Sequence, residues 1–181
     1  MEPLILITYA TKHGSTREVA EALADVLREH RLEADTAAAA DVDDLSPYAG
    51  IVVGGSLYMG RWHVDALRFL QRHRHALAVL PLAVFAMGPR TTDADQIAES
   101  RAQLGRSLGK IADVDPFAVA IFGGVVDPAQ LRFPLSRLPA SDARDWPTIR
   151  AWGDEVAAAF DYGKAAADAG DLRTELQQTP R

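Results

Sequence analysis

A short loop near the start of the chain has the residue types that bind a phosphate group. It follows the apolar run Leu4 to Tyr9 and consists of Ala10, Thr11, Lys12, His13, Gly14, Ser15 and Thr16. The segment from Thr16 to His30 has the apolar spacing of an amphipathic helix, so the loop leads directly into a helix. Free N–H groups at a helix start, together with hydroxyls and a flexible glycine, favour an anion. Ser15 with Glu18 predicts a capping box at the helix start. The alternative to an anion site is that Ser15 and Thr16 only cap the helix.

A second segment combines glycines with aromatic side chains and predicts contact with a flat ring. It follows the apolar run Ile51 to Val53 and reads Gly54, Gly55, Ser56, Leu57, Tyr58, Met59, Gly60, Arg61, Trp62 and His63. Aromatic and apolar side chains on a glycine-rich backbone suit the face of a planar ring system. The alternative is that Tyr58 and Trp62 are core residues at the edge of a sheet.

Other motifs with similar residues do not fit this sequence. The first loop lacks both the Gly-Lys-Ser/Thr ending of a nucleoside triphosphate site and the Gly-x-Gly-x-x-Gly pattern of a dinucleotide site. A serine hydrolase requires glycine two positions after its nucleophile, and Tyr58 stands there after Ser56. A phosphoacceptor receiver domain needs acidic residues at its strand ends, where this chain has uncharged ones. His73 and His75, two apart on an expected helix, point to different faces, so we predict no metal site.

Composition narrows the function further. The chain has 181 residues, of which 48% are apolar and 24% charged, which indicates an ordinary globular protein. Its 19 basic and 25 acidic residues give a formal charge of -6 without a long block of one sign, so we predict no nucleic-acid partner. Cysteine is absent, which excludes disulfides, thiolate metal sites and thiol nucleophiles. Any redox role therefore requires a bound cofactor.

No segment of the sequence is expected to span a membrane. The first apolar run is too short for a signal peptide, and no basic residue precedes it. No stretch approaches the roughly 18 to 20 uninterrupted apolar residues that a membrane helix needs. We therefore expect a cytoplasmic protein with at most peripheral contact with a membrane.

Alternating strands and helices predict an α/β fold. Four apolar runs and a weaker edge segment are expected strands: Leu4 to Tyr9, Ile51 to Val53, Leu82 to Met87, Phe117 to Phe122 and Glu33 to Ala37. Apolar residues at helical spacing lie in Thr16 to His30, Val64 to Leu70, Ile97 to Ile111 and Ile149 to Phe160. Right-handed crossovers then give a doubly wound, open parallel sheet with helices on both faces. Such sheets bind ligands where the carboxyl ends of strands meet, which adds the loops after Met87 and Phe122 to the site.

Two segments lie outside this pattern of strands and helices. We expect one domain over residues 1–162, followed by a polar, disordered tail over residues 163–181 that is rich in Ala, Asp and Gln. Val125 to Arg144 is expected to be a long loop after the last strand. Because loops of this length are uncommon unless functional, we expect it to shape the surface for a substrate or partner. Shortening it to a tight turn from Asp127 to Asp142 is expected to leave cofactor affinity and melting temperature nearly unchanged and to lower electron transfer to the substrate or partner.

With these loops placed, the sequence resembles the flavodoxin-like family, which binds FMN. Tyr9 to Thr16 is similar to the family's phosphate loop, with Gly14 and Thr16 at its glycine and its final threonine. Val52 to Gly60 and Asp145 to Trp152 are similar to the branch typified by menaquinone-dependent protoporphyrinogen oxidase. The resemblance implies a five-stranded parallel sheet in the order 2-1-3-4-5.

The resemblance also implies which residues hold the cofactor. The FMN phosphate would be held by Thr11, Lys12, His13, Gly14, Ser15 and Thr16. The isoalloxazine ring would be flanked on one side by Ser56, Leu57, Tyr58, Met59, Gly60 and Trp62, and on the other by Met87, Gly88, Pro89 and Arg90. Near the edge of the ring would lie Gly123 and Gly124. Because the flavin carries the chemistry, no catalytic side chain is required.

Two functions are compatible with such a protein. The first is an oxidoreductase that exchanges electrons between FMN and a small substrate such as a quinone or a porphyrinogen. The second is an electron-transfer shuttle that docks with protein reductases. The net charge of -6 favours the shuttle. Basic residues in the loops of the site favour an anionic small substrate, and we predict the oxidoreductase on the basis of Lys12, Arg61, Arg90 and Arg132.

Overall fold

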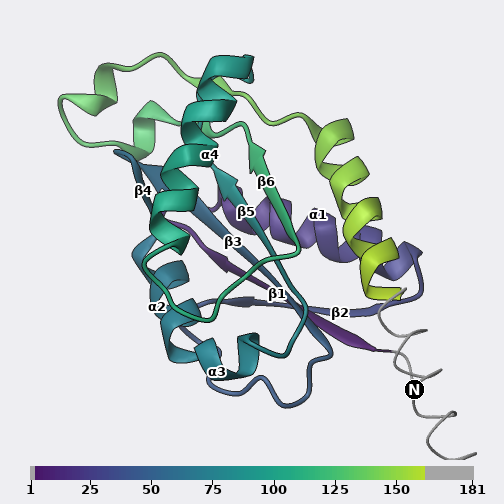
Figure 1. Cartoon of the computed structure of the whole chain (residues 1–181). Coiled ribbons are helices and arrows are strands. Elements are labelled where there is room, and N and C mark those ends of the chain that lie inside the picture. Colours follow the sequence, from purple (N-terminus) through teal and green to yellow (C-terminus); the bar gives the residue numbers. More distant parts are fainter. Residues whose placement is uncertain (1–2, 162–181) are drawn as a thin grey trace, which may run out of the picture.

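Five parallel strands form the centre of the molecule, in the order expected for a doubly wound fold. The computed structural model describes residues 3–161, so the tail predicted for 163–181 lies outside the described residues. The strands are β1 (Leu4–Ala10), β2 (Glu33–Ala38), β3 (Gly50–Tyr58), β5 (Leu82–Met87) and β6 (Ala118–Phe122). They pair in the order β2-β1-β3-β5-β6, while β4 (Arg61–Trp62) pairs antiparallel with β3 (Figure 1). The predicted 2-1-3-4-5 sheet is confirmed.

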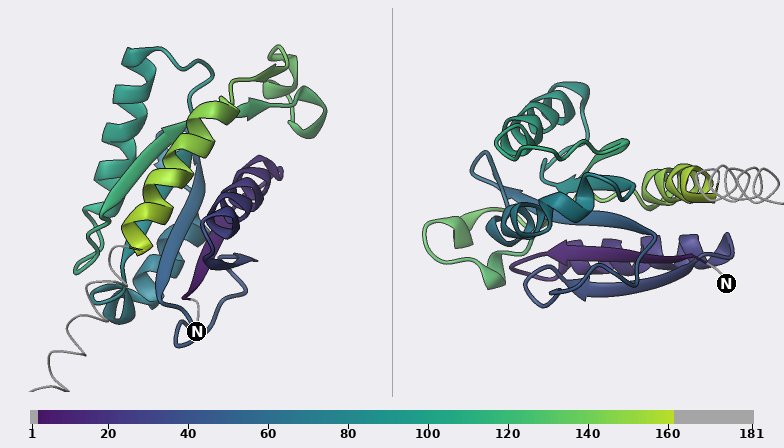
Figure 2. Two further views of the ribbon diagram at one scale, coloured as in Figure 1. Left: turned by 90° about the vertical axis from the view of Figure 1, so that its right-hand side faces the viewer. Right: turned by 60° about the horizontal axis from the view of Figure 1, so that its bottom comes forward.

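Helices cover both faces of this sheet (Figure 2). One face carries α1 (Ser15–Glu29) and a C-terminal helix over residues 146–161, and their core side chains include Val19, Leu23, Leu27, Trp152 and Val156. The other face carries α2 (Val64–Arg72), the short α3 (Arg74–Leu77) and α4 (Ala94–Leu108), and their core side chains include Phe69, Leu70 and Leu104. Strands covered on both faces are apolar without alternation, which made four of them recognisable in the sequence. None of the helices among residues 3–161 is both long and apolar enough to cross a membrane.

β3 is longer than predicted, and the two glycines expected to begin a loop lie inside the strand. A β-carbon added at Gly54 would lie 2.0 Å from Cζ of Phe85, and one at Gly55 would lie 2.6 Å from Nε1 of Trp62. The glycines therefore make room for two aromatic rings that pack against the strand. The chain turns only after Tyr58, between β3 and β4.

The capping box expected at the start of α1 is wrong. The residue before the helix is Gly14, whose φ of 91° is a left-handed conformation that favours glycine. Ser15 is the first helical residue, and no side chain caps the helix. Glu18 bonds instead with Arg144. The chain reverses at Gly14, one residue earlier than a cap at Ser15 would require.

The segment after β6 has more regular structure than the loop predicted there. β7 (Val125–Val126) pairs antiparallel with β8 (Ser141–Asp142), and two 3-10 turns lie between them, η1 (Pro128–Gln130) and η2 (Leu135–Arg137). We call residues 127–142 the arm. It projects beyond the carboxyl end of the sheet on the side of β4, as Figure 1 shows.

Replacing Gly54 with alanine should destabilise the protein, because the added methyl group would meet the ring of Phe85 in the core. We expect the free energy of unfolding to fall by roughly 1 to 3 kcal/mol, the usual cost of overpacking. The control is Gly105→Ala in α4, where a β-carbon meets nothing within 4 Å. Alanine is favoured there by roughly 0.5 to 1 kcal/mol. Urea unfolding measures both variants, and a Gly54→Ala protein as stable as the control would contradict the packing role.

Candidate functional site

Loops predicted to bind a ligand meet at the carboxyl edge of the sheet. The register pairs Ser56 at the end of β3 with Met87 at the end of β5, and Met87 with Phe122 at the end of β6. Beyond the strands, the backbone N–H of Gly124 donates to the carbonyl of Pro89 at 2.8 Å. This bond joins the loop after β6 directly to the loop after β5. Because β1 pairs with β3, the loop before α1 lies at the same edge.

The loop between β1 and α1 has free hydrogen-bonding groups beside an open space. Thr11 Oγ1 accepts a hydrogen bond from Gly14 N at 3.0 Å, which closes the turn before the helix. A β-carbon on Gly14 would meet no atom within 4 Å, so the loop is open at this residue. The first N–H groups of a helix have no partners inside it, and no side chain caps these. The loop can therefore bind an anion through its backbone.

Thr16 has a polar atom that lacks a partner. Its side chain is fully buried in the first turn of α1, and Oγ1 forms no hydrogen bond within residues 3–161. A buried polar group left unsatisfied costs about 1 to 3 kcal/mol. Such groups are rare in folded proteins, and an anionic ligand at the start of α1 would account for this one by accepting its hydrogen bond.

Lys12 and His13, which were predicted to hold a phosphate, contact neighbouring segments in this structure. Lys12 Nζ lies 6.0 Å from the centre of the Tyr58 ring, in a cation–π contact with the tip of the β3–β4 hairpin. His13 Nδ1 lies 3.1 Å from Gln130 Oε1 in the arm. The β1–α1 loop is thereby joined to two segments that flank the site.

A cavity of about 350 Å3 lies between the hairpin tip, the β5–α4 loop and α4. Six of the predicted site residues line it: Leu57, Met59, Gly60, Gly88, Pro89 and Arg90. Its remaining wall is polar and comes from one face of α4, with Gln96, Glu99, Ser100 and Gln103. These α4 residues could not be identified from the sequence, because their spacing is also that of an ordinary exposed helix face. The cavity falls within the usual size of a small-molecule site.

Of the two hairpin aromatics, Tyr58 is the one accessible to a ligand. Tyr58 and Met59 are 54% and 84% exposed, and Met59 and Gly60 form a two-residue turn with positive φ at both positions. Trp62 is 2% exposed, and its Nε1 donates to the carbonyl of Gly55 at 3.0 Å in the core. Trp62 is therefore a core residue, the alternative that the sequence left open, and its position does not allow the predicted contact with a ring.

Met87, Gly123 and Gly124 lie next to the cavity without lining it. Met87 is buried at the end of β5. A β-carbon on Gly123 would lie 1.8 Å from the carbonyl oxygen of Ala143, and Ala143 N donates to the carbonyl of Gly124 at 3.0 Å. The two glycines thus allow the ends of the arm to approach each other beside the β5–α4 loop.

Arg144 links the far end of the arm to the first turn of α1. Its guanidinium bonds with Asp142 at 2.7 Å and with Glu18, and lies 4.9 Å from the ring centre of Trp146. Hydrogen bonds with Asp142 and Glu18 raise the pKa of Arg144, and the same guanidinium lowers the pKa of Asp142. Glu18 and Arg144 are 126 positions apart, so nothing in the local sequence indicates their pairing.

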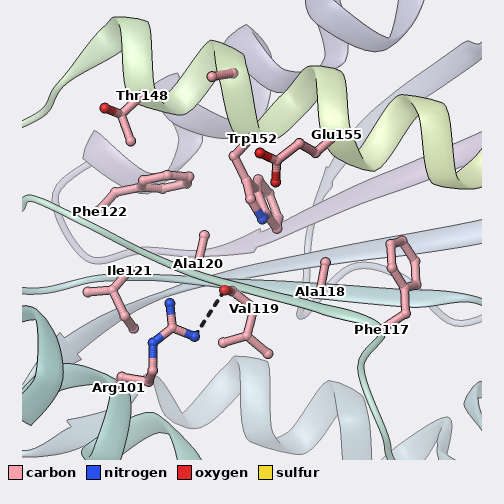
Figure 3. Close-up of a pocket in the computed structure, with 11 residues that line it drawn as sticks. Arg101, Phe117, Ala118, Val119, Ala120, Ile121, Phe122, Thr148, Trp152 and Glu155 are labelled. Atoms are coloured by element: carbon pink, nitrogen blue, oxygen red, sulfur yellow. Dashed lines mark hydrogen bonds between the residues drawn. The ribbon is translucent and has the colours of Figure 1, made fainter.

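A second cavity, of about 510 Å3, lies along the free edge of β6 (Figure 3). It is lined by Phe117 to Phe122 and, from the C-terminal helix, by Thr148, Trp152 and Glu155. Arg101 of α4 donates to the carbonyl of Val119 at 3.2 Å and so satisfies one acceptor of the edge strand. None of the predicted site residues lines this cavity, and we assign the site to the smaller one.

The sequence of this chain matches a known family and a known protein. The family model described as a flavodoxin domain matches residues 6–135, more than half of the chain. The protoporphyrinogen IX dehydrogenase (quinone) of Escherichia coli is 31% identical to this chain over 84 residues. The aligned segment is 45% of this chain and 46% of that protein, so the match spans about half the length of the curated relative.

Solved structures show the same fold. A mutant of the flavodoxin from Pseudomonas aeruginosa gives a TM-score of 0.57 at 20% identity, over 87% of this chain and 99% of that chain. Oxidised flavodoxin 2 from Bacillus cereus gives 0.56 at 20% identity, over 88% and 98% of the two chains. The rubredoxin oxygen:oxidoreductase from Desulfovibrio gigas gives 0.59 at 15% identity, over 89% of this chain and 37% of that one. At such identities the likeness shows the fold alone.

Replacing Thr16 with valine should stabilise the ligand-free protein. Valine keeps the shape of the side chain and removes the unsatisfied hydroxyl, so we expect the free energy of unfolding to rise by about 1 kcal/mol. The matched control is Thr8→Val, because Thr8 is equally buried but donates to the carbonyl of Ala37 at 3.0 Å. That variant should lose about 1 kcal/mol. Urea unfolding gives both values, and an equal loss in the two variants would show that the Thr16 hydroxyl has a partner.

Proposed function

Because the chain belongs to the flavodoxin domain family, we propose that it binds FMN and transfers electrons through it. Members of this family bind FMN and act in electron transfer. The observation that carries the proposal for this chain is the buried Thr16 hydroxyl, which has no partner within the described residues. A phosphate at the start of α1 would accept hydrogen bonds from Thr16 and from the first backbone N–H groups of the helix.

We assign the isoalloxazine ring to the cavity between the hairpin tip and the β5–α4 loop. Tyr58 and Met59 offer exposed aromatic and apolar surface at the tip. Gln96 and Gln103 on the opposite wall offer amide groups that can both donate and accept hydrogen bonds. FMN supplies the electron-transfer chemistry that the side chains of this protein lack. The role of the chain is to hold the ring, shield part of it from water and present groups that match its polar edge.

The charge around the site favours a small anionic substrate. Five basic residues lie in its loops and in the arm: Lys12, Arg61, Arg90, Arg132 and Arg137. None of them forms an ion pair within residues 3–161. These loops therefore carry cationic groups that can reach a ligand, although Glu99 lies in the cavity wall and the whole chain has a formal charge of -6. A basic site raises the local concentration of anions and favours their association.

The substrate that fits these features best combines a flat apolar ring system with negative charge. The arm presents Phe133 and Leu135 as exposed apolar side chains, beside Arg132 and Arg137. The Escherichia coli relative is named for protoporphyrinogen IX and a quinone. We therefore propose that this protein exchanges electrons between FMN and a quinone or a porphyrinogen-like compound.

An electron-transfer shuttle that docks with a protein reductase is the second candidate. The overall charge of -6 favours it, since an acidic protein is attracted to a basic partner. The exposed Tyr58 and Met59 at the hairpin tip would then lie in the docking surface. The two candidates share the cofactor and differ in what reaches the basic loops.

Purified protein should bind FMN far more tightly than riboflavin, because the phosphate adds several charge-assisted hydrogen bonds. Thr16→Ala should weaken FMN binding roughly tenfold to a hundredfold, which corresponds to the ~1.5 to 3 kcal/mol of one such bond. Riboflavin affinity should stay the same in this variant. Titration of the ligand-free protein, followed by flavin fluorescence, measures both. Equal affinity of the native protein for FMN and riboflavin would reject the phosphate site.

The double variant Arg132→Gln, Arg137→Gln should distinguish the two candidates. We expect KM for a negatively charged quinone to rise roughly tenfold, while KM for a neutral quinone changes little. The control is Arg106→Gln, an exposed residue of α4 outside the cavity wall. Oxygen-free steady-state assays measure these constants. Turnover with a protein reductase and with neither quinone would favour the shuttle.

A further inference from the structure

We propose that the hydrogen bond between His13 and Gln130 couples cofactor binding to the position of the arm. The phosphate of FMN fixes the β1–α1 loop, the loop holds Gln130 through His13, and the arm then lies against the site. This inference rests on the proposed FMN site and adds how that site is regulated. Gln130 and His13 act as positioning residues, since they work through the loop and the arm.

The two ends of the arm are attached strongly and close to the sheet. Ala143 N donates to the carbonyl of Gly124 at 3.0 Å, and β7 pairs with β8 through Val126 and Ser141. Arg144 is largely buried and bonds with two carboxylates, one of them in the first turn of α1. Charge-assisted hydrogen bonds of this kind are roughly twice as strong as neutral ones. The base of the arm is therefore fixed whether or not the site holds a ligand.

The rest of the arm is attached weakly. Among the hydrogen bonds of residues 3–161, the contact of Gln130 with His13 is the only one that joins residues 127–140 to another part of the protein. It is a single hydrogen bond between exposed groups. Phe133 and Leu135 are exposed, so they add little apolar contact that would hold this part in place. The position of residues 127–140 thus depends on one bond to the β1–α1 loop.

The geometry of Gln130 prepares it for this bond. Its Nε2 donates to Asp127 Oδ2 at 2.8 Å, which turns Oε1 toward His13. Asp127 is itself fixed as the cap of η1, because its Oδ1 accepts from Ala129 N at 3.0 Å. With Oε1 as the acceptor, His13 must donate from Nδ1. Gln130 is therefore oriented within the arm, and the bond forms when the β1–α1 loop holds His13 opposite it.

A phosphate would fix that partner. His13 lies between Thr11 and Gly14, whose hydrogen bond closes the loop, and the anion would bind at the residues that follow. When the phosphate has already ordered the loop, forming the His13–Gln130 bond no longer carries the entropy cost of ordering it. Coupling between two equilibria is reciprocal, so closing the arm must also tighten FMN binding by the same factor. The coupling predicts that shortening the arm weakens FMN binding, whereas the sequence alone predicts a nearly unchanged affinity.

The consequence is a substrate surface that is completed only in the loaded protein. Arg132, Phe133 and Arg137 lie in the segment that depends on the bond, and they include the basic and apolar groups that we assign to the substrate. Arg137 also lies 4.9 Å from the ring centre of Phe133, so these groups move as a unit. FMN binding therefore increases the fraction of molecules in which the arm presents them at the site.

Limited trypsin digestion tests the coupling directly, because Arg132 and Arg137 are cleavage sites within the arm. FMN should slow cleavage at both residues roughly threefold to tenfold, and riboflavin should give no protection, since it lacks the phosphate. Gln130→Ala should abolish the protection and weaken FMN binding by the same factor while leaving riboflavin affinity unchanged. Gln71→Ala, an exposed glutamine of α2, is the control and should behave like the native protein. Mass spectrometry of fragments that end at Arg132 or Arg137 gives the rates.

Each other outcome rejects a distinct claim. If titration shows FMN binding but cleavage rates are the same with and without FMN, the coupling is wrong and the FMN site stands. If Gln130→Ala keeps full protection, the arm is held by something other than His13. If riboflavin protects as well as FMN, the ring and not the phosphate positions the arm. If FMN does not bind at all, the proposed function itself fails.

Discussion

The start of α1 is the constraint on which the site depends. Gly14 takes a φ of 91°, so the chain leaves β1 and enters α1 with uncapped N–H groups next to an open loop. The order of the strands then decides what lies beside this loop. Because β3 pairs with β1 and β5 pairs with β3, the hairpin tip and the β5–α4 loop must end at the same edge. One backbone conformation and one strand order therefore place every loop of the site.

The strands, the helices and the anion-binding loop could largely be predicted from the sequence, because they depend on local patterns. Strands buried on both faces are continuous apolar runs, and an amphipathic helix after a glycine and hydroxyl-rich loop indicates an anion site. Gly54 and Gly55 show the limit of such patterns. A glycine that ends a strand and a glycine that makes room for a ring look the same in a sequence, and only Phe85 and Trp62 in three dimensions distinguish them.

The rest of the site could not be predicted, because it consists of contacts between distant segments. Trp62 became a core residue once β3 extended past the expected loop and turned back as β4. The polar wall from α4 depends on how that helix packs beside the hairpin. Arg144 and Gln130 reach the start of α1 from the far side of β6, across more than a hundred positions. A single sequence holds no signal for pairs of this kind, since each member alone is an ordinary polar residue.

A site for an anion must keep its donors unpaired until the anion arrives, so the ligand-free protein carries their cost. A buried hydroxyl without a partner costs about 1 to 3 kcal/mol. A ligand present at a hundred times its dissociation constant adds about 2.7 kcal/mol of stability, which is of the same size. Holding the arm in place involves a smaller free energy, because a typical hydrogen bond, such as that of His13 with Gln130, contributes only about 0.5 to 1.5 kcal/mol. Several charge-assisted bonds to a phosphate exceed that amount, so the free energy of binding is sufficient both to satisfy Thr16 and to hold the arm in place.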